Sequence, residues 1–369
     1  MDYQKLVQNA LDRAVEEGIE CGCQAAVYLD GKLVANAYSG WTDWTKSKKV
    51  DENTVFPIYS TGKAISSTVL HKLVEMGKLS YDTRISDIWK EFGCNGKEDM
   101  RVWHVMSYRA AMYQVPTLNA DGMPITDEEL ADFDYMTNLM AKSTPAEIFG
   151  ANQKYHPLTY GWLTGGIACH ALGRNDYPQI FRELVGDPAG MDRFFYGISK
   201  DEENTVTLVP GLDGSCCSET GVANMNKNVF RRCCDPSARA MSNALSIARH
   251  YAALDQGKLL KQETIDNAID TKWRAADDHF DRIKGRWDIF GLGYVLSGPV
   301  DDITRIFGHG GLGGSEGILD RKSRLAFGFT RNCFIDKSAL SYIYDAINFK
   351  NRDWPDPAEV PELLKEKSL

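Results

Sequence analysis

Ser60 and Lys63 form an S-x-x-K sequence at the start of a predicted helix. A spacing of three residues places both side chains on one helical face, within reach of each other. A serine hydroxyl becomes a good nucleophile when a neighbour accepts its proton, and a lysine whose pKa is lowered by burial can do this. The alternative is a serine that caps the helix beside a solvated lysine. The apolar run at residues 56–59 favours a buried, nucleophilic pair.

A second candidate is Tyr155, at the junction between a loop that contains proline and an apolar helix. A phenol there could accept the Ser60 proton and pass it to a leaving group, provided that a nearby Lys ammonium lowers its pKa. The chain has 16 tyrosines, and most tyrosines are packing residues, so a packing role is the alternative.

The third candidate segment is glycine-rich and covers residues 307–315, where Gly310 and Gly311 follow His309. Glycines let a backbone pass close to another group and leave N–H donors free to bind an oxyanion. The alternative is a glycine-rich strand end or bulge. The segment does not have the G-x-x-x-x-G-K-[ST] order of a phosphate-binding loop.

Together and in this order, the three segments resemble the serine β-lactamase and penicillin-binding-protein superfamily, and more closely its carboxylesterase and transesterase branch. Members carry S-x-x-K, then a tyrosine motif, then Lys-Thr-Gly or His-Gly-Gly on a sheet strand. Here these motifs fall at residues 60–63, 155–157 and 309–311. The resemblance extends over about residues 1–350.

The resemblance implies a role for each of these residues. Ser60 is expected to be acylated, and Lys63 and Tyr155 are expected to share proton transfer. The expected oxyanion donors are the backbone N–H groups of Ser60 and Leu312. His309, Gly310 and Gly311 are expected to line the substrate pocket. The resemblance calls for no metal and no cofactor.

Two positions depart from the pattern of the β-lactamases. Pro157 stands where many members have the Asn of Tyr-x-Asn, so the amide donor that grips a β-lactam side chain is missing. His309 replaces the Lys of Lys-Thr-Gly, which removes a fixed positive charge for a substrate carboxylate. Both changes favour neutral esters or thioesters over penicillins.

The functional hypothesis is therefore hydrolysis or transfer of an acyl group from a small ester, through an acyl-enzyme on Ser60. An amide, peptide or β-lactam hydrolase of the same fold is one alternative. A catalytically inactive relative that binds a ligand is another, because a fold alone does not guarantee chemistry.

The elements that must position these residues change in type along the chain. Strand patterns occur near both ends, and Asp30 and Gly31 supply a hairpin turn between the first two. Helical patterns dominate the middle. The predicted strands are 24–29, 33–38, 291–297, 315–319 and 324–330; the predicted helices are 5–17, 64–76, 101–108, 127–142, 160–172, 178–184, 238–254, 262–270 and 338–348.

This order predicts an α+β fold of the β-lactamase/transpeptidase type. An antiparallel sheet is built from N- and C-terminal segments and flanked by terminal helices, and a helical region is inserted into it. The expected sheet domain is 1–58 with 286–350, and the expected helical domain is 59–285. Residues 351–369 are expected to form an extended tail. Residues 196–235 have little periodicity and form either a lid over the substrate or a surface excursion.

Composition limits the classes of binding partner and the cellular compartment that are expected for the protein. The apolar content of 43% suits one large or two smaller cores, and the net charge of −9 disfavours nucleic acid and anionic lipid. No secretory signal or membrane span is visible, so a cytoplasmic protein with a small-molecule acyl substrate is expected. The nine cysteines show neither a disulfide framework nor zinc-ligand spacing, which predicts reduced thiols.

Overall fold

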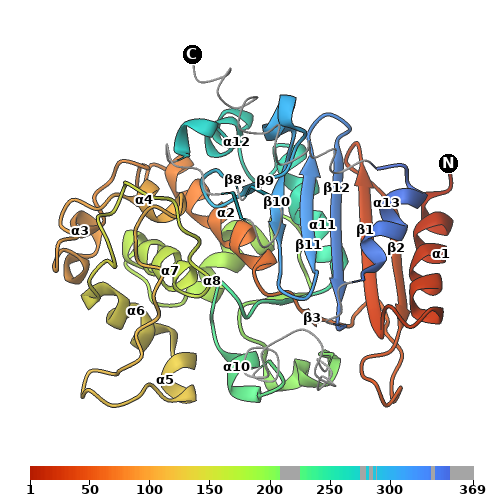
Figure 1. Cartoon of the computed structure of the whole chain (residues 1–369), viewed down its shortest axis with the longest axis horizontal. Helices are drawn as coiled ribbons and strands as arrows, with labels where there is room; N and C mark the ends of the chain where they lie inside the picture. Colours follow the sequence, from red (N-terminus) through yellow and green to blue (C-terminus); the bar gives the residue numbers. More distant parts are fainter. Residues whose placement is uncertain (208–224, 275–279, 282–285, 288, 334–336, 350–369) are drawn as a thin grey trace.

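A seven-stranded antiparallel sheet, in the order β2-β1-β12-β11-β10-β9-β8, forms the centre of the protein (Figure 1). The computed structural model describes residues 1–207, 225–274, 280–281, 286–287, 289–333 and 337–349. The strands are β1 (Gly22–Leu29), β2 (Lys32–Gly40), β8 (Ile289–Phe290), β9 (Val295–Leu296), β10 (Ile306–Gly310), β11 (Glu316–Asp320) and β12 (Leu325–Arg331). Segments from both ends of the chain thus pair in one sheet, as predicted.

The N-terminal hairpin follows the predicted turn. Asp30 and Gly31 have φ of 48° and 72°, the left-handed values that a two-residue hairpin turn requires. Strand β1 then lies between β2 and β12, with Cys23 opposite Arg331 and Leu29 opposite Leu325. The first hairpin therefore has its long-range partner at the C-terminal end of the chain.

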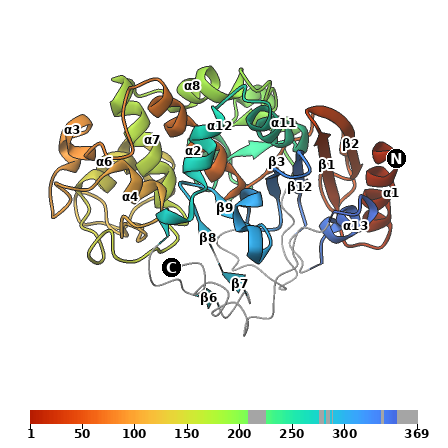
Figure 2. The same cartoon turned by 90° about the horizontal axis from the view of Figure 1, so that it is seen from above.

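Helices cover both faces of the sheet (Figure 2). The terminal helices α1 (Tyr3–Glu16) and α13 (Ala339–Ala346) share one core with β1, β2 and β12. On the other face α11 (Ala244–Asp255) packs on β1, β11 and β12, where Ala26 meets Ala244 and Ala248. Small side chains bring this helix close, because a Cβ added at Gly328 would overlap the Ala244 carbonyl oxygen.

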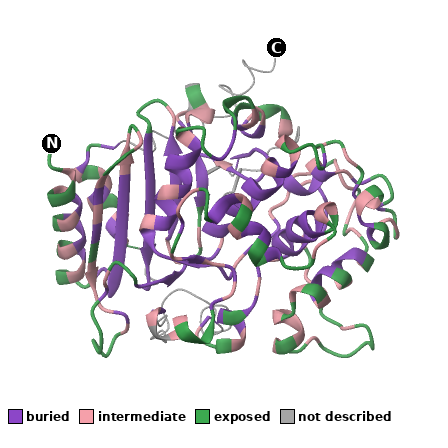
Figure 3. Ribbon diagram, turned by 180° about the vertical axis from the view of Figure 1, so that it is seen from behind, coloured by how far each residue is buried: buried purple, intermediate pink, exposed green. Residues whose placement is uncertain are grey.

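The helical region is built around two buried helices, α2 (Thr61–Glu75) and α7 (Thr159–Leu172), which pack on each other (Figure 3). The other helices are α3 (Ile85–Ile88), α4 (Val102–Met106), α5 (Asp127–Ala131), α6 (Phe133–Lys142), α8 (Tyr177–Phe181), α10 (Asn228–Arg232) and α12 (Gln262–Ala268). Short 3-10 or π turns are η1 (Lys90–Phe92), η2 (Arg182–Gly186), η3 (Lys200–Thr205), η4 (Thr271–Trp273) and η5 (Val300–Arg305).

Most predicted helices differ from the observed ones by a few residues at their ends, and two differ more. The helix predicted over 127–142 is two helices, α5 and α6, because the Asp132 side chain accepts a hydrogen bond from Tyr135 N at 2.9 Å and starts a new helix. The helix predicted over 238–254 begins only at Ala244, where Asn243 is its cap and accepts from Ser246 N at 2.8 Å.

Strands account for further differences from the prediction. Strand β10, which ends with His309 and Gly310, was not among the predicted strands, and α3 and α10 were not among the predicted helices. Residues 241–242 form β5, the middle of a small sheet in the order β3-β5-β4 that the sequence did not reveal. Its other strands are β3 (Phe56–Pro57) and β4 (Phe194–Phe195), and a separate pair joins β6 (Phe280–Asp281) to β7 (Arg286–Trp287). Of the strand predicted over 291–297, only β9 is a strand; the residues before it form the turn of a hairpin with β8, in which Gly293 has φ of 84°.

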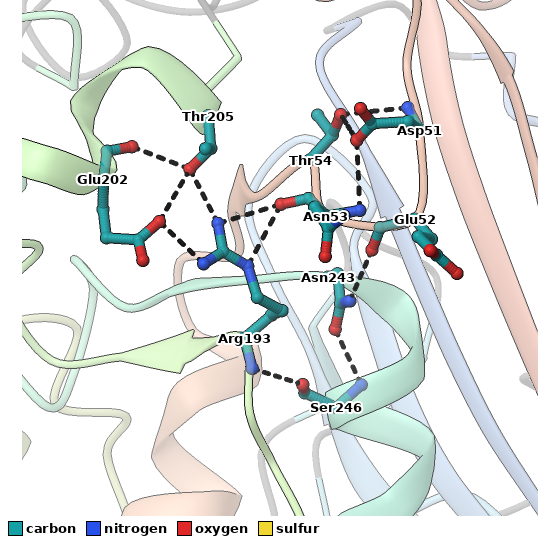
Figure 4. A network of polar contacts seen from close by, with 9 residues as sticks. All are labelled: Asp51, Glu52, Asn53, Thr54, Arg193, Glu202, Thr205, Asn243 and Ser246. Atoms are coloured by element: carbon teal, nitrogen blue, oxygen red, sulfur yellow. Dashed lines mark hydrogen bonds and ion pairs between the residues drawn. The ribbon is translucent and has the colours of Figure 1, made fainter.

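A polar network fixes the chain that leads into β3 (Figure 4). The Arg193 guanidinium donates to the Asn53 carbonyl oxygen at 3.0 and 3.1 Å and to the Thr205 hydroxyl at 2.8 Å. Asn243 Nδ2 donates to the Glu52 carbonyl oxygen at 2.9 Å. Three segments far apart in sequence are therefore joined next to the strand that precedes Ser60.

The predicted division into two domains remains a prediction. Helix α11 belongs to the part of the chain assigned to the helical domain, yet it packs on the sheet. The predicted tail, 351–369, lies outside the described residues, as does the middle of the 196–235 segment. Within the described residues, no helix is long and apolar enough to cross a membrane.

Candidate active site

Ser60 is presented by a sharp turn between β3 and α2. Tyr59 has φ of 47°, a left-handed value that is unusual for a tyrosine, and Ser60 follows with φ of −66°. Such strained residues tend to cluster at functional sites. Ser60 occupies the N-cap position, but its side chain makes no capping hydrogen bond. Its hydroxyl is thus half-buried and directed to a contact other than the helix end.

Lys63 lies one turn further along α2 and is fully buried. Its Nζ donates to three oxygens: the Ser60 hydroxyl at 3.0 Å and the carbonyls of Pro157 at 2.6 Å and Ser237 at 2.7 Å. Burial lowers the pKa of Lys63 to about 7, and the charge of Asp235 opposes that shift. The amine is therefore in contact with the serine and is able to lose its proton near neutral pH.

Tyr155 lies beside the same amine. Its ring centroid is 5.0 Å from Lys63 Nζ and 5.8 Å from the ring of His309. Phe290 stacks on it with ring centroids 5.8 Å apart and an interplanar angle of 11°. Residues from three separate parts of the chain, α2, the loop before α7 and β10, thus meet at one place.

The loop that carries Tyr155 is held by His156. The His156 ring is buried and lies between the Met112 N–H, at 3.1 Å from Nε2, and the Lys154 carbonyl, at 2.6 Å from Nδ1. Burial lowers the pKa of His156 to about 4, so the ring is neutral, with Nδ1 donating and Nε2 accepting. This histidine therefore positions the loop.

The glycine-rich segment packs against the turn that presents Ser60. His309 and Gly310 end strand β10, and a turn then leads through Gly311 to Ser315. A Cβ added at Gly311 would overlap the Ile58 carbonyl oxygen, so only glycine fits there. The Ser315 hydroxyl donates to that same carbonyl at 2.7 Å. The two segments are thus in direct contact, although more than 250 residues separate them.

The two expected oxyanion donors have free backbone N–H groups. Among the residues that the structure describes, neither Ser60 N nor Leu312 N donates a hydrogen bond to a protein acceptor. Leu312 follows Gly311 directly, and its side chain is 53% exposed. Both donors are therefore available on either side of the contact between the two segments.

Sequence reasoning missed two residues next to Lys63. The Ser237 carbonyl accepts from Lys63, its hydroxyl accepts from Gly161 N in the first turn of α7, and its N–H donates to Asp235 Oδ1 at 2.8 Å. Asp235 is fully buried. No local pattern distinguishes these residues, since only the folded chain brings them to the lysine.

A third missed residue is Tyr108, which forms an aromatic wall with Phe290 and Tyr160. Its ring centroid lies 4.6 Å from each of those rings and 5.3 Å from the ring of Tyr155. Tyr108 is buried and has φ of 60°, so it is held in a strained conformation. Tyr108 lies in a turn after α4, and no sequence pattern there indicates that its ring lines the site.

Metal-ligand clusters and disulfides do not contribute to this site. Across the described ranges, no group of three or more His, Cys, Asp or Glu side chains could hold a metal ion. Every cysteine that the structure describes is a free thiol.

Comparisons with known proteins identify the family of the chain. A model of the Beta-lactamase family matches residues 8–345. The Esterase/beta-lactamase LipL of Mycobacterium tuberculosis is 26% identical over 342 residues, which cover 84% of this chain and 77% of that protein.

Solved structures show the same fold. A family VIII carboxylesterase superposes with a TM-score of 0.80 at 24% identity, over 94% of this chain and 97% of the other. A penicillin-binding protein homologue from Caulobacter crescentus gives a TM-score of 0.79 at 23% identity, over the same shares of the two chains. The family match covers most of the chain, and the protein is therefore a member of the Beta-lactamase family and a serine hydrolase.

Proposed function

We propose that the protein cleaves small esters or thioesters through an acyl-enzyme on Ser60 and passes the acyl group to water or to an alcohol. One observation above all supports this: the buried Lys63 Nζ lies 3.0 Å from the Ser60 hydroxyl and has no ion-pair partner among the described residues. A lysine in these surroundings is suited to accept a proton.

The first step uses Lys63 as a neutral amine. Its two N–H bonds point at the carbonyls of Pro157 and Ser237, which leaves the nitrogen lone pair for the third neighbour, the Ser60 hydroxyl. Ser60 Oγ attacks the substrate carbonyl carbon while its proton moves to Nζ. The negative charge on the former carbonyl oxygen is stabilised by the N–H groups of Ser60 and Leu312.

The second step expels the leaving group. Tyr155, beside the newly formed Lys63 ammonium, donates a proton to the departing alcohol or thiol and recovers one from the ammonium. The C–O or C–S bond breaks, and the acyl-Ser60 ester remains. Water or an alcohol then attacks this ester, the same groups take up its proton, and the proton returns to Ser60 Oγ as the product leaves.

Pro157 and His309 support a neutral substrate. Pro157 presents its carbonyl oxygen to Lys63 and carries no side-chain amide that could hold a β-lactam. His309 places an imidazole, not a fixed ammonium, beside Tyr155. The rings of Tyr108 and Phe290 supply apolar surface next to Tyr155, which suits an acyl chain.

Labelling with a fluorophosphonate tests the nucleophile. The wild-type protein is expected to form one adduct, and Ser60→Ala is expected to abolish it. Ser66→Ala is the matched control, because Ser66 lies on the same helix and its hydroxyl donates to the Lys63 carbonyl. An adduct that survives Ser60→Ala, or no adduct with the wild type, would contradict the proposal.

Turnover assays separate the substrate classes. Nitrophenyl esters of short acids, assayed with and without an alcohol acceptor, are expected to be cleaved, and the ester-to-acid product ratio reports acyl transfer. Rapid nitrocefin cleavage with little ester turnover would favour the amide or β-lactam alternative. No turnover of any class would favour a ligand-binding relative.

A further inference from the structure

We propose that Asp235 is a positioning residue for the reaction, holding Lys63 in the protonation balance that acyl transfer needs; this inference rests on the proposed function. Asp235 Oδ1 accepts from Ser237 N at 2.8 Å, and the Ser237 carbonyl accepts from Lys63 Nζ at 2.7 Å. A buried carboxylate is thus linked to the catalytic amine through one residue.

The carboxylate of Asp235 is incompletely compensated. Among the described residues its Oδ2 accepts no hydrogen bond, and the nearest cation, Arg239 Nη1, is 3.8 Å away. That guanidinium also lies 4.1 Å above the Phe230 ring and donates to the Leu130 carbonyl at 3.3 Å. A buried anion with weak pairing is costly, and its field extends to nearby cations. Lys63 is such a cation.

Other titratable groups lie on the segments that contact Lys63, its helix or Asp235. They are Tyr155 and His156 from the loop before α7, Tyr196 after β4, His309 on β10, and Arg239 before β5. His156 is neutral, and the Tyr196 hydroxyl donates to the Gly62 carbonyl at 2.8 Å. Of the charged groups acting on Lys63 within the described residues, Asp235 is the anion.

Two opposing effects then set the pKa of the Lys63 amine. Burial alone lowers the pKa of the amine, and the negative charge of Asp235 raises it. A proton acceptor is most effective when its pKa is near the working pH, because it must take a proton from Ser60 and later return it. Without Asp235 the amine would be a weaker base.

The test is the pH profile of kcat/KM for a nitrophenyl ester with Asp235→Asn. Asn keeps an oxygen acceptor for Ser237 N and removes only the charge. The acid limb of the profile is expected to move to lower pH by about one unit, the lower end of the shift that a nearby opposite charge produces. The alkaline plateau is expected to fall, because the base is weaker.

Asp320→Asn is the matched control. Asp320, at the end of β11, is also fully buried, but its carboxylate binds Arg305 of η5, at 3.0 and 2.7 Å. This variant is expected to lose stability and to keep the acid limb in place. The pH at which the acid limb falls does not depend on the fraction of molecules that are folded. Partial misfolding of a variant therefore does not change the comparison.

An acid limb of Asp235→Asn that coincides with the wild type would overturn the inference. If Asp235→Asn yields no folded protein, Arg239→Gln tests the same inference. This change removes the positive charge nearest to Asp235, so the acid limb is expected to move to higher pH. An acid limb that stays in place would overturn the inference. Absence of the Ser60 adduct would instead refute the proposed function, so the two failures are distinguishable.

Discussion

Two buried cations in this protein have opposite surroundings. Arg331 on β12 is paired with buried Glu20 at 2.8 Å and donates to the Lys337 carbonyl under α13 at 3.0 Å. Lys63 on α2 is also buried, but the hydrogen-bond acceptors of its Nζ within the described residues are neutral oxygens. A carboxylate in contact stabilises a buried cation, whereas burial among neutral acceptors lets a lysine give up its proton. The first arrangement stabilises the fold, and the second is suited to chemistry.

The largest expected effect comes from Lys63→Met. Loss of the proton acceptor is expected to lower kcat/KM for a nitrophenyl ester by about a thousandfold or more. The free energy of unfolding is expected to stay level or rise, because a buried cation without a counter-ion is replaced by an apolar side chain of similar length. Ester kinetics and urea unfolding measure the two effects. Retention of a tenth of the activity would contradict the role of Lys63.

Arg331→Met should behave in the reverse way. It leaves Glu20 buried without its partner, so the free energy of unfolding is expected to fall by about 3–5 kcal/mol. Activity per folded molecule, counted by fluorophosphonate labelling, is expected to remain close to that of the wild type. If this variant lost activity while keeping its stability, the contrast between the two cations would be wrong.

Gly311→Ala tests the contact between the glycine-rich segment and the turn that presents Ser60. The added methyl group would overlap the Ile58 carbonyl oxygen and push the Leu312 N–H away from Ser60. Loss of one oxyanion donor is expected to lower kcat by about a hundredfold. Gly310→Ala is the control, since its Cβ would meet nothing closer than the Ser315 carbonyl oxygen at 3.8 Å. Equal losses in both variants would argue against this geometry.

The smallest expected effect is the pH dependence of stability. In the unfolded chain Lys63 has its ordinary pKa of 10.5, and in the folded protein burial lowers it to about 7. Between these values the unfolded chain holds the extra proton, so the free energy of unfolding rises with pH, by at most about 1.4 kcal/mol per unit. Lys63→Met should remove this contribution to the slope. Urea unfolding at pH 7 to 9 measures it.

Local spacing was enough to predict Ser60 and Lys63 as a pair, because one helical turn relates them whatever the rest of the chain does. The structure also brings the predicted Tyr155 and His309 to this pair. Asp235, in contrast, could not be predicted. Its hydrogen-bonded link to Lys63 runs through Ser237, and that link depends on long-range packing of α2, α7 and the chain before β5.

For the fold as well, local features could be predicted from the sequence and long-range contacts could not. The hairpin at Asp30 was predictable because the turn chemistry is local. The small sheet β3-β5-β4 was not, because each of its strands is two residues long and finds its partners far along the chain.

The contact of Ser315 with Ile58 and Thr61 has a consequence for the order of events during synthesis. A nascent chain that has emerged only as far as α12 already contains the proposed nucleophile and its proposed base, but it lacks the proposed second oxyanion donor and the β12 partner of β1. Such an intermediate would not be expected to cleave esters. Catalytic competence therefore arrives late, with the docking of the final strands, and the onset of ester cleavage would report completed assembly.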